Sequence, residues 1–215
     1  MSLEEKVAFC SGADFWRTKS FEKYGISSIM MCDGPNGLRK QEGKLDHLGV
    51  YKSKPATCFP ASCAIGSSWD INLAEEIGEA IGKEALLENI SIVLAPGINI
   101  KRNPLCGRNF EYFSEDPYLS GKLGAAFIRG VQKYGVGTSL KHFAVNNQEN
   151  KRLLCNSIVD ERTLREIYLA GFEIAVKEGK PSTVMCAYNK INGAYGSENH
   201  WLLSEVLKDE WGFEG

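Results

Sequence analysis

The chain has 215 residues, with 25 lysines and arginines against 27 aspartates and glutamates and a formal net charge of −2. This balance, without any run of five like charges, argues against a nucleic-acid-binding protein. Apolar runs such as 92–96 are far shorter than the ~20 residues of a membrane-spanning helix. We therefore predict a globular chain that binds neither nucleic acid nor membrane.

The cysteines and the first residues of the chain indicate its compartment and its need for metals. Seven cysteines are scattered without a CxxC pair, which argues against both a zinc site and a redox motif. The N-terminal residues contain no basic region followed by an apolar segment, so no secretory signal is predicted in them. Asp46 and His47 lack a third ligand at metal spacing. We predict a cytoplasmic protein that uses no metal and no other cofactor.

Taken in chain order, short apolar runs alternate with longer amphipathic stretches. The runs predict strands at 29–32, 61–65, 90–96, 136–140 and 183–187. Their nearly continuous apolar character is typical of strands covered on both faces in a parallel sheet. The amphipathic stretches predict helices that begin after the N-caps Asp70, Asp116 and Asp160, and a last helix over 202–211.

The alternation of strands and helices indicates an α/β fold with a parallel sheet. About five strand–helix units are predicted, fewer than the eight of a TIM-type (β/α)8 barrel, which takes about 250 residues. Two of the connections, 34–60 and 97–115, are long enough to be typical of functional loops. We predict an incomplete TIM-type barrel, whose unpaired strand edges would make the isolated chain poorly soluble or oligomeric.

Polar side chains follow four of the five predicted strands. Asp33 and Arg39 follow the first, Lys141 and His142 end the fourth, and Tyr188 follows the fifth. The loop after the third strand adds a further arginine, at position 108. Carboxylate, guanidinium, ammonium and imidazole groups together suit a ligand rich in hydroxyls, because each hydroxyl both donates and accepts. For single residues other interpretations stay open: a turn at Asp33, or a structural role for His142.

Other candidate sites are weaker. No GxGxxG follows a predicted strand, and the glycines of the 78–84 segment lie within an amphipathic pattern, so a doubly wound nucleotide-binding domain is disfavoured. Trp16 and Trp69 are candidate platforms for stacking on a sugar ring, with packing in the core as the alternative.

The order of the motifs resembles the N-terminal barrel domain of family 3 glycoside hydrolases, the β-glucosidase group, over nearly the whole length of the chain. The motifs are DGPNGLR at 33–39, FPA at 59–61, APGINI at 95–100, GRNFE at 107–111, SEDP at 114–117, LKHF at 140–143, VMCAYN at 184–189 and WGF at 211–213. The resemblance implies a binding site for a non-reducing terminal glucose. Its residues would be Asp33, Arg39, Arg108, Lys141, His142, Met185 and Tyr188.

The resemblance also implies a role for each of these side chains. Asp33 would accept hydrogen bonds from glucose hydroxyls. Arg108, Lys141 and His142 would bind the same sugar. Met185 would line the pocket, and Tyr188 would lie near the nucleophile. Arg39 would orient Asp33 or contact the next sugar.

The resemblance implies a retaining mechanism with two catalytic carboxylates. It places the nucleophile on a strand after Trp211-Gly212-Phe213 and the acid/base in a later domain, both beyond Gly215. Residues 1–215 would then form part of the barrel domain, with the remaining strands and the C-terminal α/β domain absent. We expect this chain alone to be inactive. A non-catalytic carbohydrate-binding or sensing module is the alternative.

The specificity expected from the resemblance is that of a β-glucosidase acting on β-glucosides or oligosaccharides. Lys141-His142-Phe143 is not followed by the Pro-Gly-His of the β-N-acetylglucosaminidase branch, which argues against that branch. Specificity for β-xylosides or α-arabinofuranosides stays open.

Overall fold

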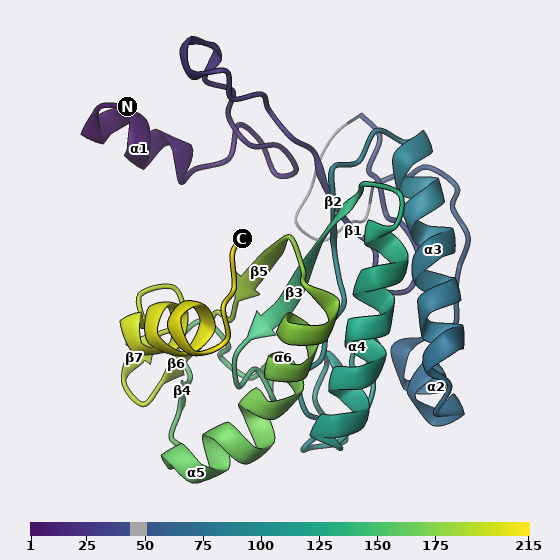
Figure 1. The fold of residues 1–215 in the computed structure, drawn as a ribbon, viewed down its shortest axis with the longest axis vertical. Helices are drawn as coiled ribbons and strands as arrows, with labels where there is room; N and C mark the ends of the chain where they lie inside the picture. The colour runs from purple at the N-terminus through teal and green to yellow at the C-terminus, as the bar shows by residue number, and fades with distance from the viewer. Residues whose placement is uncertain (44–50) are drawn as a thin grey trace.

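Four short strands form a parallel sheet in the computed structural model of the protein, which describes residues 1–43 and 51–215 (Figure 1). The order of the strands is β1-β2-β3-β5, and every neighbouring pair is parallel. The strands are β1 (Met31–Asp33), β2 (Ile92–Leu94), β3 (Gly137–Phe143) and β5 (Thr183–Cys186). β1 and β5 are the edges of this sheet and do not pair with each other, so the barrel is not closed. The predicted fold class, an incomplete parallel α/β barrel, is confirmed.

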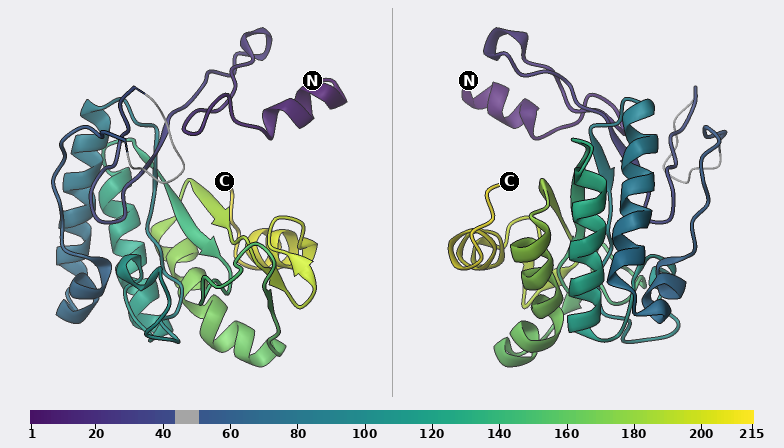
Figure 2. Two further views of the ribbon diagram at one scale, coloured as in Figure 1. Left: turned by 180° about the vertical axis from the view of Figure 1, so that it is seen from behind. Right: turned by 45° about the vertical axis from the view of Figure 1, so that its right-hand side comes forward.

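Helices lie along one side of this sheet (Figures 1 and 2). The α-helices are α1 (Leu3–Phe9), α2 (Ser62–Ser68), α3 (Ile71–Leu87), α4 (Pro117–Gln132), α5 (Glu161–Thr163) and α6 (Ala170–Ile174). The 3-10 turns are η1 (Glu22–Tyr24) and η2 (Asn109–Glu111), and the π-helical segments are η3 (Leu164–Leu169), η4 (Ala175–Gly179) and η5 (Trp201–Glu210). The predicted N-caps are confirmed, because the side chains of Asp70, Asp116 and Asp160 each accept a backbone N–H of the first turn.

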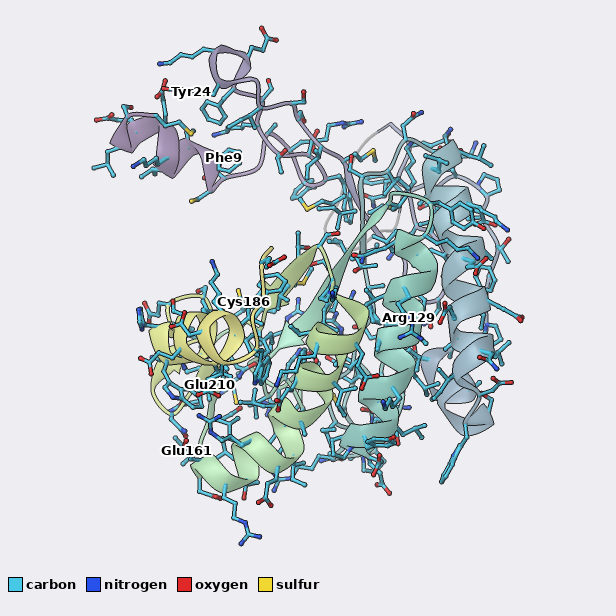
Figure 3. The ribbon with its side chains drawn as sticks, viewed as in Figure 1. Phe9, Tyr24, Arg129, Glu161, Cys186 and Glu210 are labelled. Carbon is cyan, nitrogen blue, oxygen red and sulfur yellow. The ribbon has the colours of Figure 1, made fainter. Side chains whose placement is uncertain are left out.

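Two parts of the chain stand outside the main layers. A small sheet consists of β4 (Asn156–Ser157), β6 (Lys190–Ile191) and β7 (Ala194–Tyr195). The N-terminal segment with α1 projects away from the parallel sheet, as the labels of Phe9 and Tyr24 in Figure 3 show. Phe9 packs edge-on against Phe21 within this segment, at 5.7 Å between ring centroids. The Glu5 carboxylate binds the ammonium of Lys23 and accepts the hydroxyl of Tyr24. In the described part of the chain, no helix has the length and apolar character needed to cross a bilayer.

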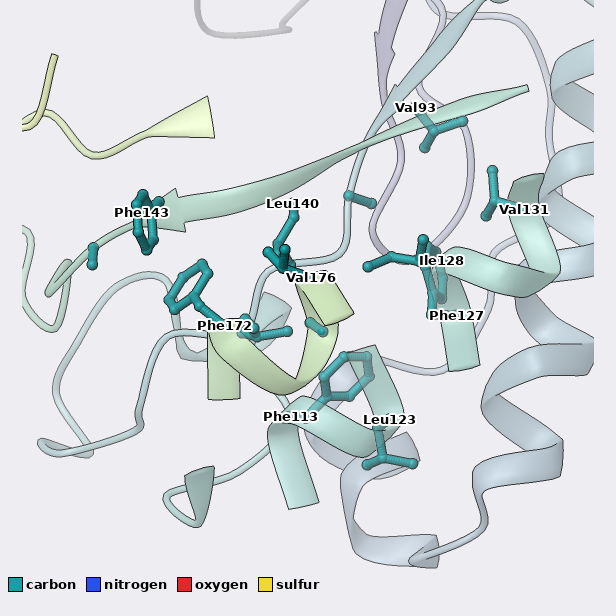
Figure 4. Packing of buried hydrophobic residues seen from close by; sticks show 14 of the residues in the cluster. Val93, Phe113, Leu123, Phe127, Ile128, Val131, Leu140, Phe143, Phe172 and Val176 are labelled. Atoms are coloured by element: carbon teal, nitrogen blue, oxygen red, sulfur yellow. The ribbon is translucent and has the colours of Figure 1, made fainter. Parts of the chain in front are cut away.

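The core lies between the parallel sheet and the helices that cover it (Figure 4). Val93 of β2 lies near Val131 of α4 and Leu140 of β3 near Val176 of η4, and all four side chains are buried. Close packing of these apolar side chains is the main stabilising contribution to such a layer. The sheet is therefore anchored on its helical side, and the carboxyl ends of its strands are left to carry loops.

The predicted strand at 61–65 is wrong, because this segment forms α2. Its buried residues, Ser62, Ile65 and Gly66, are spaced as on one face of a helix rather than alternating as in a strand. Gly66 packs so close to the next layer that a Cβ there would lie 2.3 Å from the carbonyl oxygen of Phe113. The absence of a side chain on Gly66 lets α2 pack directly against the backbone at Phe113. A short apolar run does not by itself show whether the segment is a buried strand or a buried helix. The other four predicted strands are present, with their ends shifted by at most three residues.

Helices α3 and α4 cross at a contact that only glycine allows. A Cβ on Gly130 would lie 2.2 Å from the carbonyl oxygen of Glu75, and backbone cannot yield at such a distance. Beside this contact, Arg129 of α4, labelled in Figure 3, forms an ion pair of 2.7 Å with Glu75 of α3. We expect Gly130→Ala to lower the free energy of unfolding by about 1–3 kcal/mol, the usual cost of overpacking, in a urea titration. Gly107→Ala is the control, since its Cβ would meet nothing nearer than 3.8 Å, and an equal effect in both variants would refute this account.

Candidate functional site

A pocket of about 340 Å³ opens at the carboxyl ends of β1, β2, β3 and β5. All seven residues expected from the sequence line it, and they come from segments up to 155 positions apart in the chain. The lining residues are Phe15, Trp16, Asp33, Arg39, Gln41, Leu94, Arg108, Lys141, His142, Arg152, Met185 and Tyr188. Loops at this end of a parallel sheet hold the site in α/β barrel enzymes, so the position fits the prediction.

The strands themselves hold four of the expected residues. Asp33 is the last residue of β1, and Lys141 and His142 lie near the end of β3. Met185 lies on β5 directly opposite Lys141 in the parallel register. The loops after β1, β2 and β5 contribute the other three expected residues, Arg39, Arg108 and Tyr188.

Asp33 presents an unengaged carboxylate to the pocket. Its backbone carbonyl accepts the N–H of Arg39 at 2.9 Å, which closes a turn and brings Arg39 back beside the end of β1. Within residues 1–43 and 51–215, no side chain forms a hydrogen bond or an ion pair with the Asp33 carboxylate. The side chain is half-buried. An acceptor in this position is available for a donor from a ligand.

Two basic residues of the pocket, Lys141 and Arg108, share a buried carboxylate, that of Glu111. The Glu111 side chain is only 2% exposed, and its Oε2 lies 3.1 Å from Nζ of Lys141, which is equally buried. Its other oxygen, Oε1, accepts the Nε–H of Arg108. A buried charge is tolerated only when it is paired and hydrogen-bonded, so Glu111 is what allows both cations to be held at the pocket.

Hydrogen bonds define both the position and the protonation of His142. Its Nε2 lies 2.7 Å from Nη2 of Arg108, and since a guanidinium only donates, this nitrogen must accept. Nδ1 therefore carries the proton and donates it to the hydroxyl of Tyr112 at 2.9 Å. The Asn99 side chain binds both the backbone N–H and the carbonyl of His142, at 2.8 and 2.9 Å. Burial, with the positive charges of Arg108 and Lys141, holds the pKa of His142 well below its usual value.

The neutral state of His142 has a consequence for stability in acid. The unfolded chain protonates this ring below about pH 6.5, whereas the folded protein does not, so unfolding takes up a proton. The stabilisation is fully present above that pH and is lost as pH falls below it. We expect the unfolding free energy of His142→Gln to fall less steeply between about pH 5 and 6.5 in urea titrations. His200→Gln, at an exposed site, should keep the parent slope; an unchanged slope in both variants would contradict the assignment.

Several functional candidates were missed by the sequence analysis. Glu111 was part of a quoted motif but was not assigned to the site, although it follows Arg108 by one helical turn, the spacing of an ion pair. Arg152 lies ten residues after His142 in a loop, and its guanidinium sits 4.8 Å from the centroid of the Tyr188 ring. Only the fold brings these segments together. The same holds for Leu94, Phe15 and Gln41.

The two tryptophans considered as platforms have different surroundings. Trp16 lines the pocket, and its Nε1–H donates to Oε1 of Gln41 at 3.0 Å. Trp69 is 76% exposed and lies outside the pocket. Asp46 and His47, set aside as metal ligands, lie outside the described residues. Across 1–43 and 51–215, no three acidic, histidine or cysteine side chains gather to hold a metal ion.

The fold and the pocket together define an incomplete parallel α/β barrel with a polar pocket at the carboxyl ends of its strands. The sequence profile described as the glycosyl hydrolase family 3 N terminal domain matches residues 44–215. The chain therefore belongs to glycosyl hydrolase family 3, and the resemblance stated from its motifs is confirmed.

Characterised relatives match along the entire chain. It is 61% identical over 215 residues to thermostable β-glucosidase B of Acetivibrio thermocellus, and 50% identical over 216 residues to an exo-α-(1→6)-L-arabinopyranosidase of Bifidobacterium longum. The structure of β-glucosidase 3B from Thermotoga neapolitana in complex with α-D-glucose is similar, with a TM-score of 0.92 and 46% identity over 100% of the chain. The match covers 28% of each of the first two proteins and 32% of the third, so the chain spans about a third or less of their length.

Proposed function

We propose that residues 1–215 form the sugar-binding part of a retaining β-glycosidase that removes terminal β-D-glucosyl residues. The observation that carries the proposal is the pocket at the carboxyl ends of the strands, in which all seven residues expected for a terminal glucose come together. The family and the β-glucosidases among its relatives support the reaction class.

The chemistry of the pocket suits one pyranose ring. The carboxylate of Asp33, which no side chain of the described residues engages, accepts hydrogen bonds from hydroxyls, and Lys141, Arg108 and Arg152 donate to them. His142, which is neutral and protonated on Nδ1, lines the same pocket beside Lys141 and Arg108. Charge-assisted hydrogen bonds to a hydroxyl are stronger than neutral ones, which favours a neutral polyol over an apolar ligand.

The described residues supply only part of the catalytic apparatus. Retaining hydrolysis uses two carboxyl groups about 5–5.5 Å apart, one as nucleophile and one as acid/base. Asp33 is the only acidic residue among those that line the pocket in the described chain, and the buried Glu111 is engaged by Arg108 and Lys141. We therefore propose that residues 1–215 bind the sugar while both catalytic carboxylates come from elsewhere in the complete protein.

The test is hydrolysis of p-nitrophenyl β-D-glucoside by the complete protein and by residues 1–215 alone. We expect turnover by the complete protein and none by the isolated segment. Asp33→Asn in the complete protein should lower kcat/KM by about 10²-fold, because it weakens charge-assisted bonds to hydroxyls. Asp209→Asn, at an exposed position on η5, is the matched control. Hydrolysis by residues 1–215 that Asp33→Asn abolishes would overturn the proposed division of labour.

Two alternatives give different outcomes in the same assay. A carbohydrate-binding or sensing module would bind glucose without hydrolysing any glycoside, even as the complete protein. The 50% identity to an α-L-arabinopyranosidase favours adding p-nitrophenyl α-L-arabinopyranoside as a second substrate. That sugar lacks the hydroxymethyl group of glucose and carries its 4-hydroxyl in the opposite configuration, so the ratio of the two kcat/KM values reports how strictly the pocket distinguishes these two positions together.

A further inference from the structure

A second hollow, the aromatic groove, lies outside the sugar pocket at the ends of three helices. It has a volume of about 670 Å³, within the range of roughly 300–1,000 Å³ that small-molecule sites occupy. Its walls come from the last turn of α2 and the first turns of α3 and α4. It shares no lining residue with the pocket, and the connection between β2 and α4 contributes Arg108 to the pocket and Lys101 to the groove.

Two large aromatic side chains are exposed along this groove. Trp69 is 76% exposed and Tyr118 is 64% exposed, although residues of this size normally bury most of their surface. Trp69 ends α2 with a φ of +58°, a left-handed conformation that usually falls to glycine or asparagine. A tryptophan held in that conformation outside the core contributes little to packing, so its exposed ring is available for a ligand.

The groove also contains unpaired polar groups of both signs. Lys101 is half-buried, and within residues 1–43 and 51–215 its ammonium has no hydrogen-bond or ion-pair partner. Burial lowers the pKa of Lys101, and the nearby Cys63 thiol offsets this only in part. Glu115 is an exposed residue of the same lining and likewise has no partner in the described chain. The groove thus offers a donor and an acceptor together with its aromatic rings.

We propose that the aromatic groove is a second, non-catalytic site for β-linked glucose oligosaccharides. A pyranose ring has an apolar C–H face, which stacks on an aromatic ring such as Trp69 or Tyr118, and a rim of hydroxyls. Those hydroxyls accept from the ammonium of Lys101 and donate to the carboxylate of Glu115. Such a site would hold a longer chain on the protein while the pocket binds its terminal unit.

The experiment separates the groove from the pocket by using the complete protein with Asp33→Asn, which weakens binding in the pocket and slows hydrolysis of the probe. Cellotetraose is titrated in a calorimeter. We expect residual binding in this background, weakened about tenfold by a further Trp69→Ala and similarly by Tyr118→Ala, because each removes a stacking face. Leu105→Ala, at a residue 89% exposed that lines neither site, should leave the affinity unchanged.

Thermal melting of each variant shows whether it is folded. If Trp69→Ala does not fold, the affinity of Tyr118→Ala for cellotetraose tests the groove instead. Loss of all cellotetraose binding with Asp33→Asn alone would overturn the second site and leave the proposed function standing. Equal affinity of the Trp69→Ala and Leu105→Ala variants would also overturn it. So would dissociation of an oligomer by Trp69→Ala, since the groove would then be a contact between copies of the chain.

Discussion

Glu111→Gln is expected to destabilise the protein by about 3–5 kcal/mol, the usual cost of leaving a buried charge without its partner. The substitution keeps the size of the side chain but removes the negative charge that Lys141 and Arg108 share. The buried ammonium of Lys141 and the partly buried guanidinium of Arg108 would then face a neutral amide. The measurement is the free energy of unfolding from urea titration, and Glu76→Gln at an exposed position of α3 is the matched control.

The same variant should also lose sugar affinity, because Lys141 and Arg108, the two cations proposed to bind the glycoside, are no longer held in place. If Glu111 positions Lys141 and Arg108, the Glu111→Gln variant should bind glucose more weakly than the parent even at low temperature, where the variant is still folded. Unfolding midpoints within experimental error of the Glu76→Gln control would show that Glu111 is not the common counter-ion of the site.

Replacing Lys141 or His142 by alanine is expected to lower kcat/KM of the complete enzyme about 10²-fold on an aryl β-glucoside, provided that their bonds tighten in the transition state. Both side chains are buried at the end of β3 and aimed into the pocket. Lys141→Ala removes one ligand of Glu111 but leaves Arg108 bound to it, so the protein should still fold.

The control for these two variants is Lys208→Ala, at an exposed position on η5. Michaelis–Menten kinetics with each variant separate kcat from KM. Parent-like kinetics in both Lys141→Ala and His142→Ala would mean that the two residues are structural and that the sugar is bound by other groups.

The sequence predicted the polar composition of the pocket well because of one geometric rule. Parallel strands end at the same edge of a sheet, so residues such as Asp33, Lys141 and Tyr188, each near a predicted strand end, had to converge there. The helix starts were equally predictable, since the capping interaction at Asp70 or Asp116 is local in the chain. The error at 61–65 has the opposite origin, because a short apolar run does not distinguish a buried strand from a buried helix, and α2 is packed against Phe113 by segments distant in the chain.

The order of motifs along the chain was enough to determine the family, the parallel α/β class and the seven residues that face the pocket. Only the folded structure decided that Glu111 neutralises Lys141 and Arg108 at once, that His142 is neutral with its proton on Nδ1, and that Trp69 stays exposed. These features depend on burial and on contacts between segments distant in the chain. Electrostatic energies change several-fold between water and a protein interior, and no local pattern of residues specifies which side chains leave the water.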